Sequence, residues 1–143
     1  MRKARLEGSM FEKTVDYGLH DTLVHDIEVE ENGVSLSFRE GVYELSGEGK
    51  EISLTKPCKM CITVENFDKT DLYAHCSFYK CRKNRYAEIG YSELKTLLGT
   101  NPFEIDLDYY SPFARAVLLR GHIGAYRIEM QITEVQTIAF EAL

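Results

Sequence analysis

The sequence has an excess of acidic over basic residues and no long apolar run, and both features exclude classes of function. Seventeen Lys and Arg stand against 23 Asp and Glu, a net charge of −6. Because phosphate neutralisation needs clustered cations, nucleic acid is not expected as a partner. No apolar run approaches the ~20 residues that span a bilayer, so no membrane partner is expected. No signal segment opens the chain, which makes the cytoplasm the expected location.

Repeats, low-complexity segments and Pro- or Gly-rich linkers are also missing. The chain has 143 residues, of which 44% are hydrophobic, which is enough for one domain with a buried core. We therefore predict a single β-rich domain over residues 10–143. Residues 1–9 show no clear period and precede a second methionine, so we interpret them as a tail or an expression remnant.

A β-hairpin is the clearest element of the sequence. Apolar and polar residues alternate over 23–30 and again over 34–38, as in half-buried strands. The Asn32-Gly33 pair between them is the preferred sequence for a two-residue type I′ turn, which fixes the register. The cross-strand pairs predicted by this turn are Val29 with Leu36, Ile27 with Phe38, Asp26 with Arg39, and His25 with Glu40.

Further alternating segments predict an all-β, mainly antiparallel fold, a β-sandwich or flattened barrel of about eight to ten strands. The other expected strands are 42–45, 51–54, 59–64, 72–79, 86–89, 103–108, 114–119 and a final strand from residue 126. One short helix is predicted near residues 92–99, with Ser92 as its N-cap and Gly99 at its end. Because strands do not alternate with long helices, a βαβ nucleotide-binding fold is disfavoured.

Four cysteines in a C-x2-C and C-x4-C pattern are candidate zinc ligands. They are Cys58, Cys61, Cys76 and Cys81. Thiolates at this spacing hold zinc when each pair lies in a tight turn. In a strand, residues three or five apart point to opposite faces, which favours separate cysteines buried as small hydrophobic residues. The sequence thus predicts no cofactor, with zinc as the alternative.

His25 and Glu40 form a second candidate site, because the predicted register places them opposite each other. A histidine beside a carboxylate suits acid–base chemistry in a cleft. It equally suits a histidine at the edge of the core that is satisfied by hydrogen bonding. We keep the binding of a small ligand near this pair as an alternative function.

An acidic and aromatic stretch is the third candidate site. Glu104, Asp106 and Asp108 alternate with apolar residues and are expected on one face of a strand, before Tyr109 and Tyr110. Three carboxylates along a straight strand cannot all reach one calcium ion, whose ligands lie at about 2.3–2.6 Å. Carboxylates beside exposed tyrosines instead suit the capture of a basic protein partner.

The β-rich part opens with Tyr17-Gly18-Leu19-His20-Asp21. A strand, an Asn-Gly turn and a strand that ends in Phe38 follow. This opening resembles that of small bacterial all-β proteins containing domains of unknown function, some of which are encoded near toxin and immunity genes. The resemblance implies a bacterial, non-enzymatic β protein and assigns no catalytic residue.

The sequence therefore predicts a non-catalytic protein-interaction module, immunity-like or otherwise accessory. Its predicted binding residues are Asp106, Asp108, Tyr109 and Tyr110, with a basic protein as partner. One alternative is a zinc-binding protein or metal-dependent enzyme that uses the four cysteines. The other is a small-ligand-binding β-sandwich. A homodimer is compatible with all three, because a second copy can complete an exposed edge strand.

Overall fold

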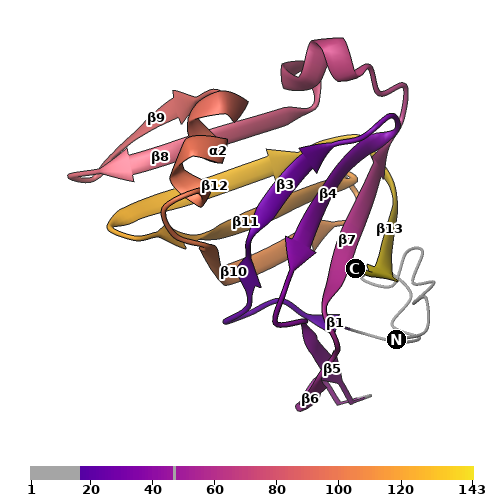
Figure 1. Ribbon diagram of the computed structural model, residues 1–143. Helices are drawn as coiled ribbons and strands as arrows, with labels where there is room; N and C mark the ends of the chain where they lie inside the picture. Colours follow the sequence, from indigo (N-terminus) through magenta and orange to yellow (C-terminus); the bar gives the residue numbers. More distant parts are fainter. Residues whose placement is uncertain (1–16, 47) are drawn as a thin grey trace.

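The computed structural model describes residues 17–46 and 48–143, where two large antiparallel sheets form the two layers of a sandwich (Figure 1). The first has the order β13-β7-β4-β3, from β3 (Asp26–Val29), β4 (Gly33–Phe38), β7 (Cys58–Val64) and β13 (Val135–Ala142). The second has the order β2-β10-β11-β12-β8-β9, from β2 (Leu23–Val24), β8 (Cys76–Arg82), β9 (Arg85–Ile89), β10 (Phe103–Ser111), β11 (Ala116–Ile123) and β12 (Tyr126–Ile132).

A small third sheet and two short helices complete the described part of the chain. The sheet has the order β1-β5-β6, from β1 (Tyr17–Gly18), β5 (Tyr43–Leu45) and β6 (Glu51–Leu54). The helices are the 3-10 helix η1 (Lys69–Ala74) and the α-helix α2 (Tyr91–Leu98). Both large sheets end in open edges, so the fold is a β-sandwich and not a flattened barrel.

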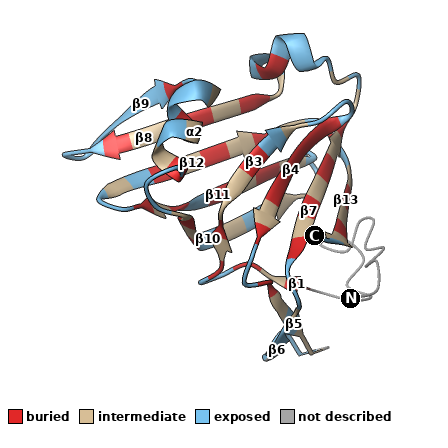
Figure 2. Ribbon diagram, in the orientation of Figure 1, coloured by how far each residue is buried: buried red, intermediate tan, exposed pale blue. Residues whose placement is uncertain are grey.

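Apolar side chains from the inner faces of the two large sheets form the core (Figure 2). Leu36 and Met60 from the four-stranded sheet and Phe78 and Leu119 from the six-stranded sheet are at most 1% exposed. This follows from strand geometry, since alternate side chains share a face. Helix α2 adds Leu94 and Leu98 to the core beside β3.

The predicted all-β, mainly antiparallel sandwich with one short α-helix is confirmed, although the described residues form thirteen strands. One unexpected strand is β13, which begins after Glu134 turns the chain with a φ of 56° and then pairs with β7. The predicted strand 72–79 is wrong in its first part. There Asp68 caps η1 by accepting a hydrogen bond from the N–H of Thr70 (2.9 Å), and Leu72 is buried from that helix.

The β3–β4 hairpin is present, but its register differs from the prediction by two residues. Val29 pairs with Val34 rather than with Leu36, so the turn lies at Glu31-Asn32. A shift of two residues leaves every side chain on its predicted face, because the side-chain period of a strand is two. The residues of this hairpin that were predicted to be buried are therefore the same, although their predicted cross-strand partners were wrong.

Gly33 has a different role from the one that the turn prediction gave it. Its φ does not lie in the left-handed region, and it is the first residue of β4. A Cβ at this position would lie only 1.9 Å from the carbonyl oxygen of Ile62 on the neighbouring strand β7. Gly33 is therefore needed for the close approach of two strands and not for a type I′ turn.

Helix α2 also begins earlier than predicted. Its N-cap is Gly90, which has no side chain to accept a capping hydrogen bond, while Ser92 lies inside the helix. Its end at Gly99 agrees with the prediction. The start is instead held by the Tyr73 hydroxyl, which accepts a hydrogen bond from the N–H of Tyr91 (2.8 Å). Residues 1–9, interpreted as a tail, lie outside the described residues.

Candidate functional site

A β-bulge divides the acidic stretch on β10. The register with β11 shifts between Ile105 and Leu107, which leaves Asp106 as the extra residue. Before the bulge, Glu104 pairs with His122 on the outer face of the six-stranded sheet. One inserted residue exchanges the two faces for the rest of the strand. Even-numbered residues of β10 therefore point outward before Asp106, and odd-numbered residues point outward after it.

After the bulge, Asp108 and Tyr110 turn toward the core. Asp108 pairs with the fully buried Leu119, and burial raises the pKa of its carboxyl group. Tyr110 packs against the core. The prediction that Glu104, Asp106 and Asp108 share one face is therefore wrong.

Two of the four predicted binding residues, Asp106 and Tyr109, remain exposed on the outer face. Leu107, which the alternation predicts to be buried, is 44% exposed there, and Tyr109 is 57% exposed. Their cross-strand partners are Arg120 and Leu118. The bulge thus places Leu107 and Tyr109 on the surface in place of Asp108 and Tyr110.

Three carboxylates from two distant segments meet on this outer face. Oxygen atoms of Asp21, Glu104 and Asp106 lie within 4.8 Å of one another, and we call these three residues the acidic cluster. His122 borders it, with Nδ1 3.3 Å from Asp106 and Nε2 3.8 Å from Glu104. Asp21 is positioned by its left-handed φ of 63° and by its N–H, which donates to the carbonyl of Ile105 (2.8 Å).

Asp21 and His122 were not among the site residues predicted from the sequence. Asp21 comes next to β10 because β2, two residues further along, pairs with Phe103 and Glu104. His122 comes there through the β10–β11 register. The His20-Asp21 dipeptide was visible in the sequence, but no local spacing connects it with a strand more than eighty residues away.

A shallow apolar depression of about 260 Å³ lies further along the same outer face. It is lined by Tyr109, Ser111, Ala116, Val117, Leu118, Gln131 and Thr133. Phe113 is fully exposed in the turn between β10 and β11. We call the surface made by the acidic cluster, Leu107, Tyr109, Leu118 and Phe113 the β10 face.

The edge of β10 that points away from β11 is only partly covered. Among the strands of residues 17–46 and 48–143, β2 is the one that pairs with this edge, at Phe103 and Glu104, and the backbone of Asp21 and Thr22 extends the contact to Ile105. Leu107 and Tyr109 lie beyond it. A strand edge without a neighbouring strand offers backbone N–H and C=O groups to another chain.

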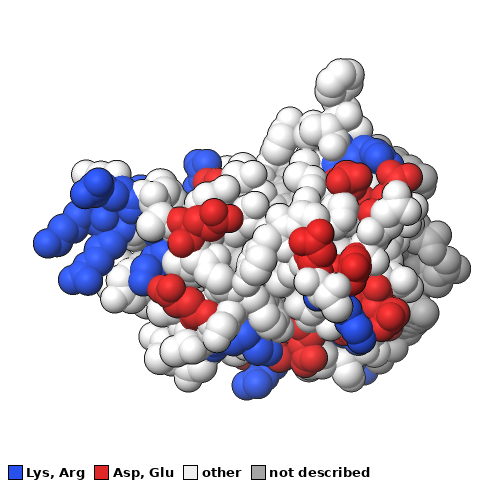
Figure 3. Space-filling view, turned by 90° about the horizontal axis from the view of Figure 1, so that it is seen from above, with Lys and Arg blue, Asp and Glu red and all other residues white. Residues whose placement is uncertain are grey.

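The β8–β9 hairpin presents charge of the opposite sign. Figure 3 shows a group of Lys and Arg at the left-hand end of the molecule, where this hairpin ends. Arg82, Lys83 and Arg85 are exposed there. Lys80 on the same hairpin does not add to this exposed positive charge in the same way, because its Nζ forms an ion pair with Glu93 (2.6 Å).

His25 and Glu40, predicted to lie together, are in contact. His25 Nε2 is 2.5 Å from Glu40 Oε1, although the N–H of His25 bonds the carbonyl of Ser37 in the shifted register. The contact forms because Glu40 lies in the turn just after β4. Asp26 does not pair with Arg39 as predicted, since its carboxylate bonds Lys95 (2.5 Å).

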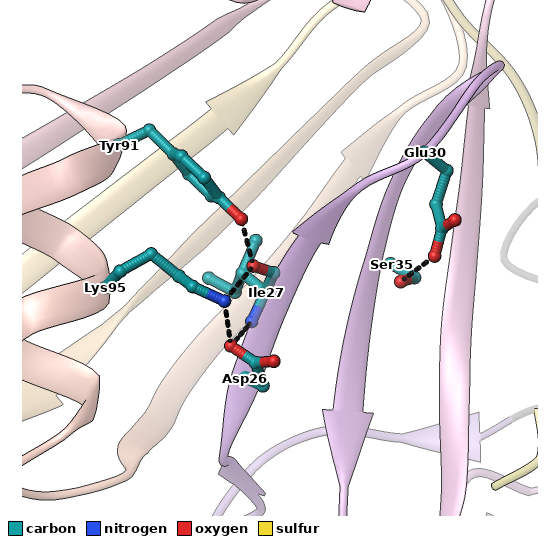
Figure 4. A network of polar contacts seen from close by, with 6 residues as sticks. All are labelled: Asp26, Ile27, Glu30, Ser35, Tyr91 and Lys95. Carbon is teal, nitrogen blue, oxygen red and sulfur yellow. Dashed lines mark hydrogen bonds and ion pairs between the residues drawn. The ribbon is translucent and has the colours of Figure 1, made fainter.

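Asp26 and Lys95 belong to a polar network that fastens α2 to β3 (Figure 4). The carbonyl of Ile27 accepts hydrogen bonds from the Tyr91 hydroxyl (2.6 Å) and from Lys95 (3.3 Å). Burial by itself raises the pKa of Asp26, but its hydrogen bond and ion pair with Lys95 outweigh burial and leave the pKa below 3.8. The same hydrogen bond raises the pKa of Lys95.

The contribution of the Asp26–Lys95 ion pair to the free energy of unfolding is expected to be lost in acid. Because the pKa of Asp26 is lower in the folded chain than its ordinary 3.8, the stabilisation is complete above pH 3.8 and disappears as the pH falls through the folded pKa. Both side chains are about a third exposed, so Asp26→Asn is expected to cost only about 0.5–1 kcal/mol at neutral pH. Urea unfolding across a pH series measures it, with Asp71→Asn as the exposed control. An equal loss at acidic and neutral pH would contradict the assignment.

The structure does not bring the four cysteines together. Cys58 and Cys61 lie on β7, whereas Cys76 and Cys81 lie on β8 in the opposite sheet. All four are free, and within each pair the odd spacing places the thiols on opposite faces. The one group of metal-ligating side chains that comes close enough among the described residues is the acidic cluster. The four-thiolate zinc site, which the sequence left as an alternative, is therefore not assembled among the described residues.

Cys76 is expected to resist alkylation in the folded protein. Burial raises its pKa from 9.0 to about 12 and that of Cys61 to about 11. At mildly alkaline pH the thiolate fraction of Cys76, and with it the alkylation rate, should fall roughly a thousandfold below that of an ordinary thiol. Mass spectrometry of iodoacetamide-treated protein measures this, with urea-unfolded protein as the control. Equal rates in the two samples would contradict the buried placement.

Comparisons with protein-family models, with curated proteins and with solved structures find no match for this chain. Over the described ranges, no helix combines the length and the apolar character that crossing a membrane requires. The class of protein is thus defined by the fold alone, an open antiparallel β-sandwich. Its function has to be argued from the chemistry of its surface.

Proposed function

We propose that this chain is a non-catalytic protein-interaction module whose β10 face binds an extended, basic segment of a partner protein. The observation that carries the proposal is a partly uncovered strand edge whose exposed Leu107 and Tyr109 lie beside three carboxylates. An extended segment can add to such an edge as a further strand, with backbone hydrogen bonds for affinity and alternate side chains for specificity.

The acidic cluster is the reason for a basic partner. Three carboxylates held within 4.8 Å repel one another, and their neighbours are two histidines, His122 beside Glu104 and Asp106 and His20 beside Asp21 (3.2 Å), which carry charge only when protonated. A Lys or Arg from the partner relieves that repulsion and gains charge-assisted hydrogen bonds. The net charge of −6 also steers a cationic segment toward the chain.

The apolar depression is the reason for a specific anchor. Along the β10–β11 ladder, Tyr109 and Leu118 lie four residue pairs from Glu104 and His122, and Leu107 with Arg120 is the outward-facing pair between them. An extended segment spans that distance with roughly 3.4 Å per residue. An apolar or aromatic side chain of the partner can then fill the depression while a cation reaches the carboxylates. Buried anchors of this kind carry most of the affinity of an interface.

A second copy of the chain is a poorer occupant than a basic partner. If two β10 strands paired antiparallel, the end of one would lie near the acidic cluster of the other. The cation that follows β10, Arg115, already bonds Glu65 (2.9 Å). Self-association would therefore leave the carboxylates without a counter-charge.

The proposal includes an immunity-like or accessory role in a bacterial cytoplasm. A protein of that kind acts by occupying the surface of another protein and needs no catalytic group. The resemblance at residues 17–38 supports this role, as does the concentration of exposed Leu107, Tyr109 and Phe113 within seven consecutive positions.

Selection from a displayed library of random linear peptides tests the proposal. We expect the full chain, immobilised at low salt, to enrich peptides in which apolar residues alternate with Lys or Arg. Enrichment of acidic peptides, or of none, would overturn the proposal. Size-exclusion chromatography with light scattering accompanies the selection. A dimer that Tyr109→Ala dissociates would assign the β10 face to a second copy and overturn the basic partner.

A further inference from the structure

We propose a second binding site, separate from the β10 face, that takes a small oxyanion: a carboxylate or a phosphate group. The site is a groove of about 390 Å³ where the C-terminal end of α2 meets the beginning of the β3–β4 hairpin. Its lining consists of His25, Asp26, Arg39, Lys95, Leu98, Gly99, Thr100, Asn101 and Pro102. That volume lies within the roughly 300–1,000 Å³ of small-molecule sites.

The charges in the groove do not cancel. Asp26 bonds Lys95 (2.5 Å), and His25 bonds Glu40 (2.5 Å). Arg39 also lines the groove, and no described residue is an ion-pair or hydrogen-bond partner for it. A guanidinium is always charged and presents several N–H donors in a fixed fork. The groove thus holds one exposed cation that has no partner among the described residues, in a chain whose net charge is −6.

Further donors point to the same ligand chemistry. The Lys95 ammonium has three N–H donors, and it gives two of them to Asp26 and to the carbonyl of Ile27. Lys95 and Asn101 both line the groove with Arg39. Carboxylate and phosphate groups both accept paired, charge-assisted hydrogen bonds from a guanidinium, which are stronger than those of a neutral ligand.

The end of α2 does not oppose an anion. The last carbonyl groups of a helix carry partial negative charge when they are unsatisfied. Here the N–H of Gly99 donates to Lys95 (3.1 Å) and to Thr96 (3.2 Å), and the N–H groups of Thr100 and Asn101 donate to Leu97 (2.9 and 3.2 Å). Because these carbonyl groups are satisfied, the charge of Arg39 makes the net charge of the groove lining positive.

The remaining lining determines what else the ligand carries. Leu98 and Pro102 supply apolar contact, and the Thr100 hydroxyl is already engaged, since it donates to the carbonyl of Leu97 (2.7 Å). A small metabolite with one anionic group and a short apolar body fits this combination. A cationic ligand does not fit, because the charge of Arg39 in the groove is positive.

Amide and side-chain NMR of the full-length, 15N-labelled protein tests the site. Inorganic phosphate and acetate are titrated separately, at constant ionic strength adjusted with sodium chloride. We expect saturable shifts at Gly99, Thr100, Asn101 and the Arg39 Nε, and an affinity about tenfold lower in Arg39→Gln. Saturation by phosphate alone assigns a phosphate-bearing ligand, and saturation by acetate alone assigns a carboxylate.

Arg85→Gln is the matched control, because it removes the same charge from the exposed β8–β9 hairpin. Its titration should equal that of the wild-type protein. The spectrum of Arg39→Gln itself shows whether the variant is folded. Shifts that do not saturate, or equal affinity in Arg39→Gln and the wild-type protein, would overturn the proposal. Neither result depends on the β10 face, so this site and the proposed protein interaction can fail independently.

Discussion

Replacement of Gly121 by alanine is expected to destabilise the protein by about 2–3 kcal/mol, the largest effect of any single substitution considered. A Cβ at Gly121 would lie 1.8 Å from the carbonyl oxygen of Glu104 and 2.9 Å from the ring of Phe103. Because the first contact is with the backbone of the neighbouring strand, β10 must move away from β11. That movement disturbs the core at Phe103 and the acidic cluster at Glu104 together.

Urea unfolding monitored by circular dichroism measures this loss. Gly99→Ala is the control, since Gly99 has a helical φ of −68° and the nearest atom to an added Cβ lies 3.3 Å away. We expect the control to stay within about 0.5 kcal/mol of the wild-type protein. Equal midpoints for Gly121→Ala and the wild-type protein would contradict the strand contact on which the placement of Glu104 depends.

The second large effect concerns binding and not stability. Tyr109→Ala is expected to weaken the binding of a selected basic peptide by about 2 kcal/mol, or roughly thirtyfold, because it removes one wall of the apolar depression. The free energy of unfolding should change by less than about 0.5 kcal/mol, since Tyr109 is 57% exposed. Isothermal titration calorimetry provides the affinity.

Tyr86→Ala is the matched control for this prediction. Tyr86 is a similarly exposed tyrosine (47%), but it lies on β9, at the opposite edge of the six-stranded sheet from β2 and β10. Its replacement should leave the affinity unchanged. If the two variants bound the peptide equally well, Tyr109 would not be an anchor and the β10 face would lose its apolar component.

The fold class could be predicted from the sequence because alternation reports burial directly. Leu36, Met60 and Ile128 are buried as alternation requires. The register of the hairpin could not be predicted, because a glycine at position 33 is expected both in a type I′ turn and where two strands approach closely. In the structure only the close approach to β7 requires it. The boundary between η1 and β8 was missed because the buried Leu72 continues the apolar pattern.

The candidate site was only partly predictable. The contact between His25 and Glu40 was predicted and is present, since both residues lie at the open end of one hairpin. The outward position of Leu107 and the inward position of Asp108 could not be read from the sequence. A bulge at Asp106 reverses the faces, and an aspartate in an alternating strand carries no local signal for a bulge.

Chemical-shift mapping of the 15N-labelled chain with a selected peptide tests whether the β10 face binds a basic segment. We expect shifts at Leu107 and Tyr109 on β10 and at Leu118 on β11, with new hydrogen-exchange protection on the open edge of β10. Asp21, Glu104 and Asp106 should shift with them as a cation reaches the acidic cluster. Shifts that instead gather on β9, β3 or the Arg39 groove, with Leu107 and Tyr109 unchanged, would contradict it.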